Sequence, residues 1–288
     1  MTTTRTVPPG GVRTDAGLAT LGPEATRLVA ALDEVFLAWA VQAGAVEKTL
    51  PPLLPVAELE ALGVYRNFPQ LAMVASALRA EEVAEAGALP GEIPATLLEA
   101  AQLALPSATC YGVYLDLKGQ EIPDGSVVTA VAGCYRNETR FDGLRRLRAF
   151  RMREIVALGS PEHTQRHLAR FRDVILRFAE QAGLELEATV ATDPFYDAEG
   201  PQAAWQRLSP VKHEFVHGGD LAVASVNAHR TYFGDRCAIS LAGSGARIST
   251  SCVAFGLERW VHALGEAHGG DWDRILAAVE RSRAVSLR

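Results

Sequence analysis

The sequence predicts an α+β fold with a mainly antiparallel sheet, and three observations lead to this class. Two extended runs around residues 130–158 are joined by a polar loop, as in a β-hairpin. Further extended runs with turns between them follow over residues 185–256. Segments with helical spacing of apolar residues stand before, between and after these strands. Strands joined by hairpins and flanked by helices favour this fold class.

The composition is that of an ordinary globular protein. The chain has 288 residues, of which 48% are hydrophobic and 22% are charged, enough for one large domain or two small ones. A formal net charge of −6 gives no general basic surface for nucleic acid. The longest uncharged apolar run, FLAWAVQAGAV, is too short to span a bilayer, and the four cysteines match no disulfide framework. We therefore expect a cytoplasmic protein with no membrane partner.

The amino-terminal part combines a leader, a helix and a proline-rich segment. Residues 1–22 are rich in Thr, Pro and Gly and are expected to form a flexible leader, which leaves residues 23–288 as one domain. A helix follows, with Leu28, Leu32 and Trp39 at helical spacing. The next segment is VEKTLPPLLP, which suits an edge strand because proline cannot donate to a sheet ladder. This strand can lead to a dimer contact, and an irregular connector is the equal alternative.

The segments before the hairpin are predicted as two helices and a strand. The acidic segment RAEEVAEAG is expected to be a solvated helix. Residues 94–105, PATLLEAAQLAL, have a helical pattern that stops before Pro106. The following PSATCYGVYLDL alternates like a strand, with Cys110 and Tyr114 on one side.

The segments after the hairpin begin with a long helix. Ser160 and Pro161 are typical of a helix start. Further strands are expected in LELEATVATDPFYD, KHEFVHGG, DLAVASVNAHR and RCAISLAG. The segment ARISTSCVAFGLERWVHALGEAHG runs from a strand into a helix, and one more helix begins near Asp271.

The hairpin carries the residues that point most clearly to chemistry. Its first strand, TAVAGCYRNE, ends in Arg136 and Glu138. Its second, RAFRMREIVAL, places Phe150, Met152 and Glu154 on one face if strand alternation holds. Such charges inside a hairpin are costly unless they bind something, because unpaired charges are rarely buried. We therefore expect a small, flat anion here; a solvated strand face is the alternative.

General nucleotide and hydrolase motifs are absent from the sequence. There is no G-x-x-x-x-G-K-S/T, no G-x-G-x-x-G after a strand and no G-x-S-x-G elbow in its usual context. No histidine pair has H-E-x-x-H spacing. The histidines interpreted as surface or structural residues are His163, His217, His262 and His268.

Three segments together resemble the signature motifs of class II aminoacyl-tRNA synthetases. They are the proline-bearing strand, the hairpin with CYRNETR and LRAFRMREIVALGSPEH, and STSCVAFGLERW near the carboxyl end. The likeness is greatest to seryl-type enzymes and, within them, to a truncated group, the amino acid:carrier protein ligases. It covers roughly residues 24–269 and implies a class II synthetase-like antiparallel sheet flanked by helices, with residues 23–288 as the catalytic domain.

The resemblance implies an ATP site built from the hairpin and the last motif. Arg136 would hold the α-phosphate and the activated carboxylate, Glu138 the adenine amino group, and Phe150 would stack on the adenine. Arg259 would grip the γ-phosphate, and Arg146 would contact pyrophosphate. Arg136 and Arg259 are the catalytic candidates, because fixed arginines stabilise the charge of a pentacoordinate phosphorus without reorganising.

The resemblance also implies a Zn²⁺ ion in the active site. Archaeal seryl enzymes and the carrier protein ligases bind zinc through two cysteines and a glutamate, and Cys110, Glu154 and Cys252 fall on those positions. Two thiolates and a carboxylate leave a fourth tetrahedral position open, which the neutral α-amino group of the substrate would fill. The alternative is two buried cysteines beside an ion-paired Glu154.

Weaker candidates lie on later strands expected to line the same pocket. Ser225 and Asn227 fall where the family contacts ATP and Mg²⁺. Asp193, Lys212 and Glu214 are candidates for substrate binding. Each of the five is equally open to a structural role.

We interpret the chain as a homodimeric, ATP-dependent ligase. It would activate glycine, alanine or serine with ATP and Mg²⁺ and pass it to the phosphopantetheine thiol of an acyl or peptidyl carrier protein. Transfer to tRNA is not expected, since the tRNA-binding arm of seryl enzymes has no counterpart and a basic surface is lacking. The alternatives are transfer to tRNA or another biosynthetic acceptor, and an inactive paralogue serving as a binding subunit.

Overall fold

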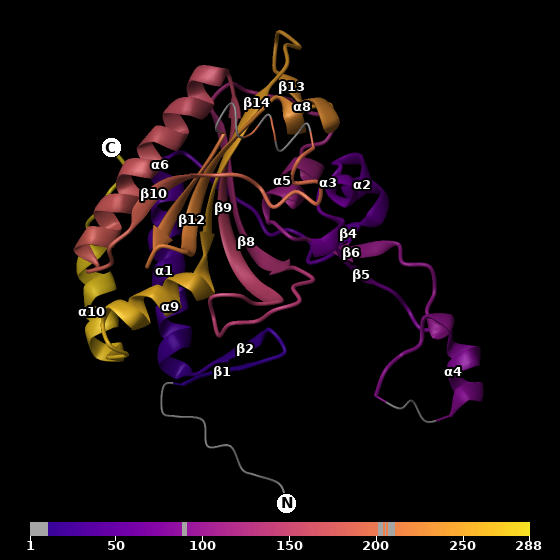
Figure 1. Ribbon diagram of the computed structural model, residues 1–288. Coiled ribbons are helices and arrows are strands. Elements are labelled where there is room, and N and C mark those ends of the chain that lie inside the picture. The colour runs from indigo at the N-terminus through magenta and orange to yellow at the C-terminus, as the bar shows by residue number, and fades with distance from the viewer. Residues whose placement is uncertain (1–10, 88–90, 201–203, 205, 207–210) are drawn as a thin grey trace, which may run out of the picture.

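A computed structural model of the chain shows a seven-stranded sheet at its centre (Figure 1). The structure describes residues 11–87, 91–200, 204, 206 and 211–288. The strand order in this sheet is β10-β11-β12-β14-β9-β8-β3. Neighbouring strands are antiparallel except β3, which runs parallel to β8 at the edge. The predicted α+β class is confirmed. The strands are β3 (Val46–Glu47), β8 (Ser126–Tyr135), β9 (Ala149–Gly159), β10 (Glu187–Ala191), β11 (Lys212–His217), β12 (Leu221–Arg230) and β14 (Ser249–Gly256).

One face of the sheet is covered by a helical layer (Figure 1). The main core lies between this layer and the sheet, where the ring of Phe36 stacks on that of Phe255 with centroids 4.1 Å apart. The predicted start of the long helix is also confirmed, because the Ser160 side chain accepts a hydrogen bond from the backbone N–H of His163. The helices of this layer are α1 (Pro23–Gln42), α6 (Pro161–Gln181), α9 (Leu257–Ala267) and α10 (Trp272–Ser282).

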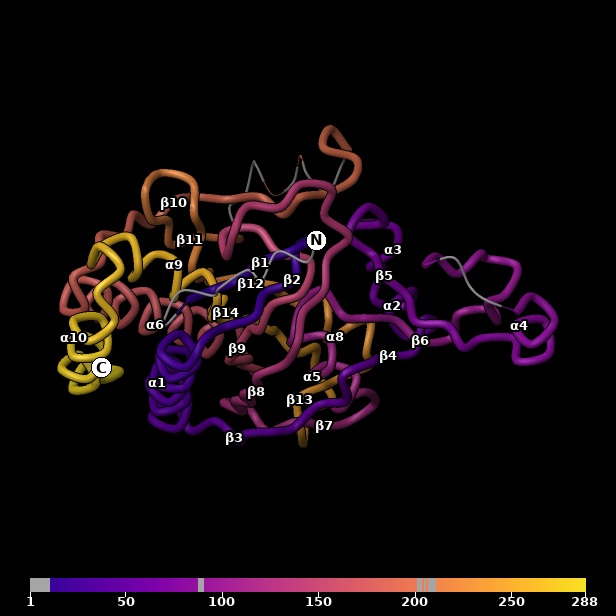
Figure 2. Tube along the Cα trace, turned by 90° about the horizontal axis from the view of Figure 1, so that it is seen from below, coloured from indigo at the N-terminus to yellow at the C-terminus, as the bar shows by residue number. Residues whose placement is uncertain are grey.

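The opposite face carries shorter elements and a second core. Tyr114 and Phe233 stack there with ring centroids 4.2 Å apart. Helix α4 (Ala80–Ala86) stands away from the body of the molecule in both views (Figures 1 and 2). The other elements are α2 (Val56–Ala61), α3 (Val64–Asn67), α5 (Cys110–Asp116), α8 (Tyr232–Arg236), the 3₁₀ turns η1 (Pro69–Leu71) and η2 (Ala95–Leu97), and the strands β4 (Leu54–Pro55), β5 (Met73–Ala75), β6 (Leu103–Leu105), β7 (Glu121–Ile122) and β13 (Ser240–Leu241).

Three local predictions on this face are wrong. Residues 94–105 form a 3₁₀ turn and the strand β6, which pairs with β4 and β5. The segment with Cys110 is the helix α5, whose consecutive residues Cys110 to Tyr114 are all buried, so alternation was not a guide to burial. The strand expected in RCAISLAG is reduced to β13, because its first residues belong to α8 and the turn after it.

The expected leader is also partly wrong, because residues 12–21 form a hairpin. Strands β1 (Val12–Asp15) and β2 (Leu18–Leu21) are joined at Ala16 and Gly17, which have φ angles of 48° and 77°. The Gly17 carbonyl accepts a hydrogen bond of 2.8 Å from the backbone N–H of Arg148. The hairpin is thereby attached to the loop between β8 and β9. The remainder of the predicted leader, residues 1–10, lies outside the described residues.

An ion-pair cluster around the buried Arg153 joins the sheet to its edge strand and to α1. Arg153, on the core side of β9, is only 1% exposed. Its guanidinium group donates to Asp33 of α1 at 2.5 and 2.9 Å, to Glu47 of β3 at 3.0 Å and to Thr129 of β8 at 3.2 Å. The cluster therefore fixes the position of β3 at the sheet edge. Only Val46 and Glu47 of the predicted edge strand lie there: residues 48–53 form the irregular connector that was the alternative, and Pro55 belongs to β4 of a separate sheet.

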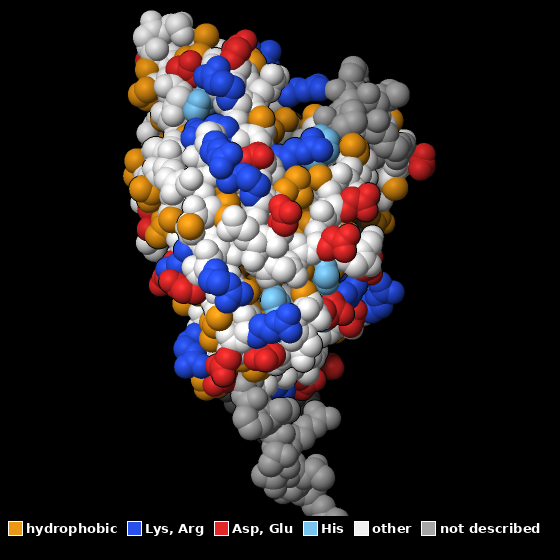
Figure 3. All heavy atoms as spheres, turned by 90° about the vertical axis from the view of Figure 1, so that its left-hand side faces the viewer, with side chains coloured by type: hydrophobic (Ala, Val, Ile, Leu, Met, Phe, Trp, Pro, Cys, Tyr) orange, Lys and Arg blue, Asp and Glu red, His pale blue; other side chains and the backbone are white. Residues whose placement is uncertain are grey.

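The outer surface of the helical layer is polar. Figure 3 looks onto this side, where basic and acidic side chains are interspersed and hydrophobic side chains are scattered among them. Among the described residues, no helix has both the length and the apolar character that crossing a membrane requires.

Candidate active site

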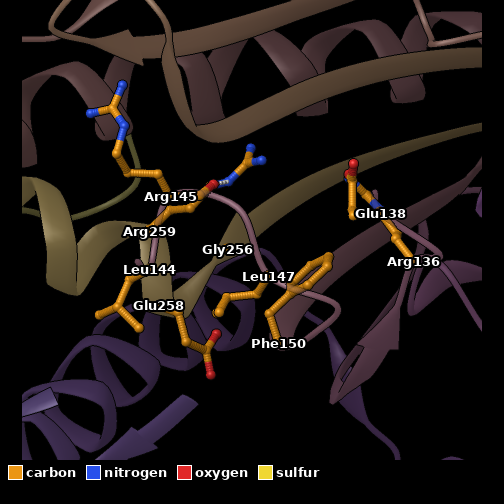
Figure 4. A pocket seen from close by; sticks show the side chains of 9 residues that line it. All are labelled: Arg136, Glu138, Leu144, Arg145, Leu147, Phe150, Gly256, Glu258 and Arg259. Atoms are coloured by element: carbon orange, nitrogen blue, oxygen red, sulfur yellow. Dashed lines mark hydrogen bonds between the residues drawn. The ribbon is translucent and has the colours of Figure 1, made fainter. Parts of the chain in front are cut away.

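A cleft of about 910 Å³ opens on the face of the sheet opposite the helical layer. Every site residue proposed from the sequence lines this cleft except Phe150. Phe150 lines a small pocket beside it, together with Arg136, Glu138 and Arg259 (Figure 4). The structure therefore brings the whole predicted set together. The role of each residue stays a prediction.

One end of the cleft holds two arginines, Arg136 and Arg259, with no carboxylate partner among the described residues. The Arg136 guanidinium lies 5.0 Å from the centre of the Phe150 ring and 3.4 Å from the Ser107 carbonyl oxygen. Arg259 donates to the carbonyl oxygens of Arg145, at 3.0 Å, and of Ala222, at 2.9 Å (Figure 4). Burial, and then the positive charge of Arg136, lower the pKa of Arg259 to about 10, so it is still charged at neutral pH. The two arginines together form a site for an anion.

Three other arginines of the hairpin, Arg145, Arg146 and Arg151, are each paired with a carboxylate. Arg145 pairs with Asp142, Asp220 and Glu266, and Arg151 pairs with Glu258 at 2.9 Å. In the cleft, Arg146 pairs with Glu138 at 2.7 Å. The two residues predicted to contact pyrophosphate and adenine therefore contact each other here.

Cys110, Glu154 and Cys252 form a buried cluster at the other end of the cleft. Their ligand atoms all lie within 4.8 Å of one another. Glu154 and Cys252 come from the adjacent strands β9 and β14, and Cys110 from the first turn of α5. The Glu154 Oε1 accepts hydrogen bonds from the backbone N–H groups of Thr109, at 2.9 Å, and Cys110, at 3.2 Å. These bonds hold the start of α5 against the sheet.

The chemistry of this donor set fits a divalent cation. The hydrogen bond with Cys252, burial and the Glu154 carboxylate raise the pKa of Cys110 well above its usual range. Although the hydrogen bond from Cys110 lowers it, burial and the Glu154 carboxylate raise the pKa of Cys252 to about 11. Three acidic groups crowded at one buried point repel one another as anions, and a metal ion removes that repulsion. Two sulfurs and a carboxylate are a ligand set typical of Zn²⁺.

A charged wall lies between the two ends of the cleft. Lys212 on β11 is 3.0 Å from Glu214 and 3.0 Å from Asp193, which follows β10. Although burial opposes it, the two carboxylates raise the pKa of Lys212. Across the strand pair, Glu214 faces Ser225 and Lys212 faces Asn227. Two carboxylates against one ammonium leave a net negative charge in this wall.

Sequence reasoning missed His229, which lines the same cleft. Its Nδ1 is 2.9 Å from the Tyr114 hydroxyl and its Nε2 is 3.7 Å from the Cys252 sulfur. Burial lowers the pKa of His229 to about 4, so the ring is neutral at pH 7. The i, i+2 spacing of Ser225, Asn227 and His229 was only a partial signal, because an irregularity of β12 between Ala228 and Arg230 breaks the strand alternation at His229.

Comparison with solved structures defines the class of the fold. The chain matches the seryl-tRNA synthetase of M. kandleri, solved with A. aeolicus tRNASec, with a TM-score of 0.75 and 20% identity over 96% of this chain and 59% of that one. It also matches the prolyl-tRNA synthetase of Giardia lamblia, solved with prolyl-adenylate, with a TM-score of 0.65 and 13% identity. This match covers 87% of this chain and 47% of that one. The fold is thus that of class II aminoacyl-tRNA synthetases, and the chain spans less than two thirds of either synthetase.

Comparison with curated proteins defines the family. The chain is 32% identical over 243 residues to amino acid–(acyl-carrier-protein) ligase 1 of Bradyrhizobium diazoefficiens, which is 80% of this chain and 74% of that protein. It is 31% identical over 234 residues to ligase 2 of the same organism, and this match covers 77% of this chain and 69% of that protein. A type-2 serine–tRNA ligase of Methanopyrus kandleri is 30% identical over 140 residues, 44% of this chain and 26% of that protein. No protein-family model matches. The chain belongs to the amino acid–(acyl-carrier-protein) ligase family, a family of ATP-dependent ligases.

Proposed function

We propose that this chain activates a small amino acid with ATP and transfers it from the aminoacyl-adenylate to the phosphopantetheine thiol of a carrier protein. One observation carries the proposal: a single cleft holds two arginines with no carboxylate partner among its described surroundings and, at its other end, a Cys/Glu/Cys cluster. The arginines suit the phosphates of ATP, and the cluster suits a metal that binds an amino group. The names of the relatives support a carrier protein as the acceptor.

The activation step requires charge stabilisation rather than a nucleophile from the enzyme. The amino acid carboxylate attacks the α-phosphorus of Mg²⁺-bound ATP, the new O–P bond forms, and the bond to pyrophosphate breaks. Arg136 would stabilise the charge at the α-phosphorus, and Arg259 would hold the departing phosphates. The Phe150 ring would stack on the adenine, and Glu138 would accept a hydrogen bond from its amino group once Arg146 turns to the pyrophosphate. Ser225 and Asn227 would contact the ATP-bound Mg²⁺.

The proposed metal site would select amino acids over plain carboxylic acids. Cys110, Glu154 and Cys252 would hold Zn²⁺, which when bound supplies a Lewis-acidic position for a neutral α-amino group. The wall of Asp193, Lys212 and Glu214 would contact the same substrate. We propose glycine, alanine or serine as the amino acid, and the exchange assay described below decides among them.

The transfer step needs an acceptor that reaches the adenylate. The acceptor thiolate attacks the adenylate carbonyl, the thioester bond forms, and AMP leaves with the electrons of the broken C–O bond. This reaction requires no covalent enzyme intermediate. We also propose a homodimer that works in the cytoplasm, where its four free cysteines would stay reduced.

Two assays test the proposed function. ATP–pyrophosphate exchange is measured with a panel of amino acids, and we expect exchange with one or more of the small ones. Transfer is then compared for a carrier protein with phosphopantetheine, the same carrier without it, and tRNA. We expect transfer to the phosphopantetheine form alone. Absence of exchange with every amino acid would contradict the activation step, and transfer to tRNA instead of the carrier would contradict the proposed acceptor.

The metal assignment has its own test. Cys110→Ser and Cys252→Ser should each lose bound zinc and most of the exchange activity, because both remove a sulfur ligand. Cys237→Ser is the matched control, since Cys237 is also buried but does not line the cleft. Metal content is measured by elemental analysis of the purified chains. Full zinc and unchanged amino acid selectivity in both ligand variants would contradict the assignment.

A further inference from the structure

His229 occupies an irregular position of β12 beside the proposed metal site. Along the pairing of β12 with β14, Ala228 faces Ser251 but Arg230 already faces Thr250. Two residues of β12 advance against one of β14, so His229 is the extra residue of a β-bulge. Arg230, directly after it, has a φ of 53°, in the left-handed region. A β-bulge changes the direction of a side chain and is frequent beside active sites.

The bulge directs the His229 ring between a ligand and an aromatic cluster. Nε2 lies 3.7 Å from the Cys252 sulfur, and Nδ1 lies 2.9 Å from the Tyr114 hydroxyl. The ring stands at 88° to that of Phe233, with centroids 4.8 Å apart, and Phe233 in turn stacks on Tyr114. Tyr114 itself is fully buried in α5. The orientation of the imidazole is therefore fixed from two sides.

The partners of the ring decide where its proton lies. We assign the Tyr114 O–H as the donor to Nδ1, because the N–H at Nε2 then faces a sulfur that can accept it. The single ring proton is then on Nε2, which faces the Cys252 sulfur. The amide of Asn227, two residues earlier on the same strand, lies 3.4 Å from that sulfur. Two N–H groups of β12 thus converge on one sulfur.

We propose that His229 is a positioning residue of the metal centre, where its Nε2–H donates to the Cys252 thiolate. The inference rests on the metal site proposed above. An N–H···S bond orients the thiolate and stabilises its negative charge, as groups that hydrogen-bond to metal ligands do in other sites. Because Nε2 carries a proton, it is not itself a ligand. The fourth position of the metal remains available for the amino group of the substrate.

The test measures metal binding rather than activity. The complete chain is loaded with Co²⁺, whose absorption reports both coordination number and sulfur ligation, and Zn²⁺ affinity is measured by competition with a chelator. In His229→Ala we expect Zn²⁺ affinity to fall by about 10- to 100-fold. The sulfur-to-cobalt charge-transfer band should shift, and the four-coordinate d–d bands should remain. Tyr114→Phe should change both readouts in the same direction by less, because the ring loses the partner that fixes its proton.

Two further variants make the test independent of folding. In His229→Gln the side-chain amide can donate in place of Nε2–H, so it should recover most of the affinity lost in His229→Ala. His163→Ala, on α6 and outside the cleft, should behave like the wild type. If His229→Ala does not fold, Tyr114→Phe and His229→Gln decide the question.

Three outcomes of these measurements would contradict the role of His229, its protonation or the metal site itself. Unchanged affinity and spectrum in His229→Ala and Tyr114→Phe, with normal loading of the wild type, would overturn the role of His229 alone. Glycine is also added to the cobalt-loaded wild type. If glycine leaves that spectrum unchanged and the d–d bands change in His229→Ala, then His229 is itself a metal ligand, and the proposal is overturned. A wild-type chain that binds neither ion would overturn the metal site and this inference together.

Discussion

Arg136 and Arg259 differ from the neighbouring arginines in what they bind. Within the part of the chain that the structure describes, both donate only to backbone carbonyl oxygens, whereas Arg145, Arg146 and Arg151 each pair with a carboxylate. Both side chains are partly buried, and a partly buried cation without a counter-charge costs stability. An anion that binds between them supplies the missing negative charge and removes this cost. We therefore expect the two side chains to lower the stability of the free chain and to favour anion binding.

This difference predicts the phenotype of Arg259→Ala. ATP–pyrophosphate exchange should fall by about 100- to 1,000-fold, the loss typical of a fixed donor that stabilises transition-state charge. The free energy of unfolding, measured in urea, should stay the same or rise, because a buried charge is removed. Arg177→Ala removes an exposed ion pair with Asp173 and should leave exchange unchanged. Lost stability together with unchanged exchange would show that Arg259 is a structural residue.

The predictable site residues are those whose identity follows from an ordered motif. The residues of the hairpin and of F-G-L-E-R could be named because each has a distinctive chemistry at a fixed place. Their convergence on one cleft is now shown by the structure. His229 could not be named, because its position depends on a β-bulge between β12 and β14, and one extra residue in a strand leaves no trace in the sequence of that strand alone.

At the scale of elements, burial on one side was predictable and burial on all sides was not. The helices α1 and α6 have a polar and an apolar side, so their helical periods are visible. The hairpin β8–β9, whose second strand is buried at every position from Arg153 to Gly159, was predicted from its two extended runs and the polar loop between them. The segment of α5 is buried at five consecutive positions, and β6 is a short strand in a three-stranded sheet. Neither has a period that distinguishes helix from strand, and both were predicted wrongly.

The packing of α6 on β9 predicts a pH dependence of stability. Burial lowers the pKa of His167 to about 3, and its ring lies 3.4 Å from the Ile155 carbonyl oxygen. In the unfolded chain its pKa is near 6.5, so between these values the unfolded state binds more protons. Stability should therefore fall as the pH falls from about 6.5 toward 3, by at most about 1.4 kcal/mol per pH unit for this group. His167→Gln should show a smaller slope in urea unfolding across that range, and parallel curves would contradict the prediction.

The cluster around Arg153 predicts a loss of stability from a single substitution. Arg153→Leu leaves Asp33 and Glu47 without their partner, so the free energy of unfolding should fall by about 3 kcal/mol. Arg247→Ala breaks an exposed pair with Asp235 and should have little effect on the free energy of unfolding. Equal losses in the two variants, measured by urea unfolding, would mean that the Arg153 cluster does not connect α1 and β3 to the sheet.

At the scale of the whole molecule, the free edge of the large sheet predicts a dimer. The edge strand β3 exposes 61% of Val46, and Val41 at the end of α1 is exposed to the same extent. Exposed apolar residues on an edge strand favour association. Sedimentation should give twice the mass of one chain, and Val46→Glu should shift it toward one chain. Val74→Glu, at an equally apolar position of β5, should leave the mass unchanged; a wild-type monomer would exclude this interface.

The turn at Gly17 supports the loop between β8 and β9, although it lies outside the segment that the three motifs delimit. A Cβ added to Gly17 would lie 2.4 Å from the Phe141 ring, and the Gly17 carbonyl holds the backbone of Arg148. A shortened chain beginning at Pro23 would keep the sheet and every cleft residue. The loop with Arg145 and Arg146 would, however, lose its contacts with the turn at Gly17. Its melting temperature would change little while its Michaelis constant for ATP rose. A ligase shortened to the boundaries of its motifs would thus fold normally but bind ATP weakly.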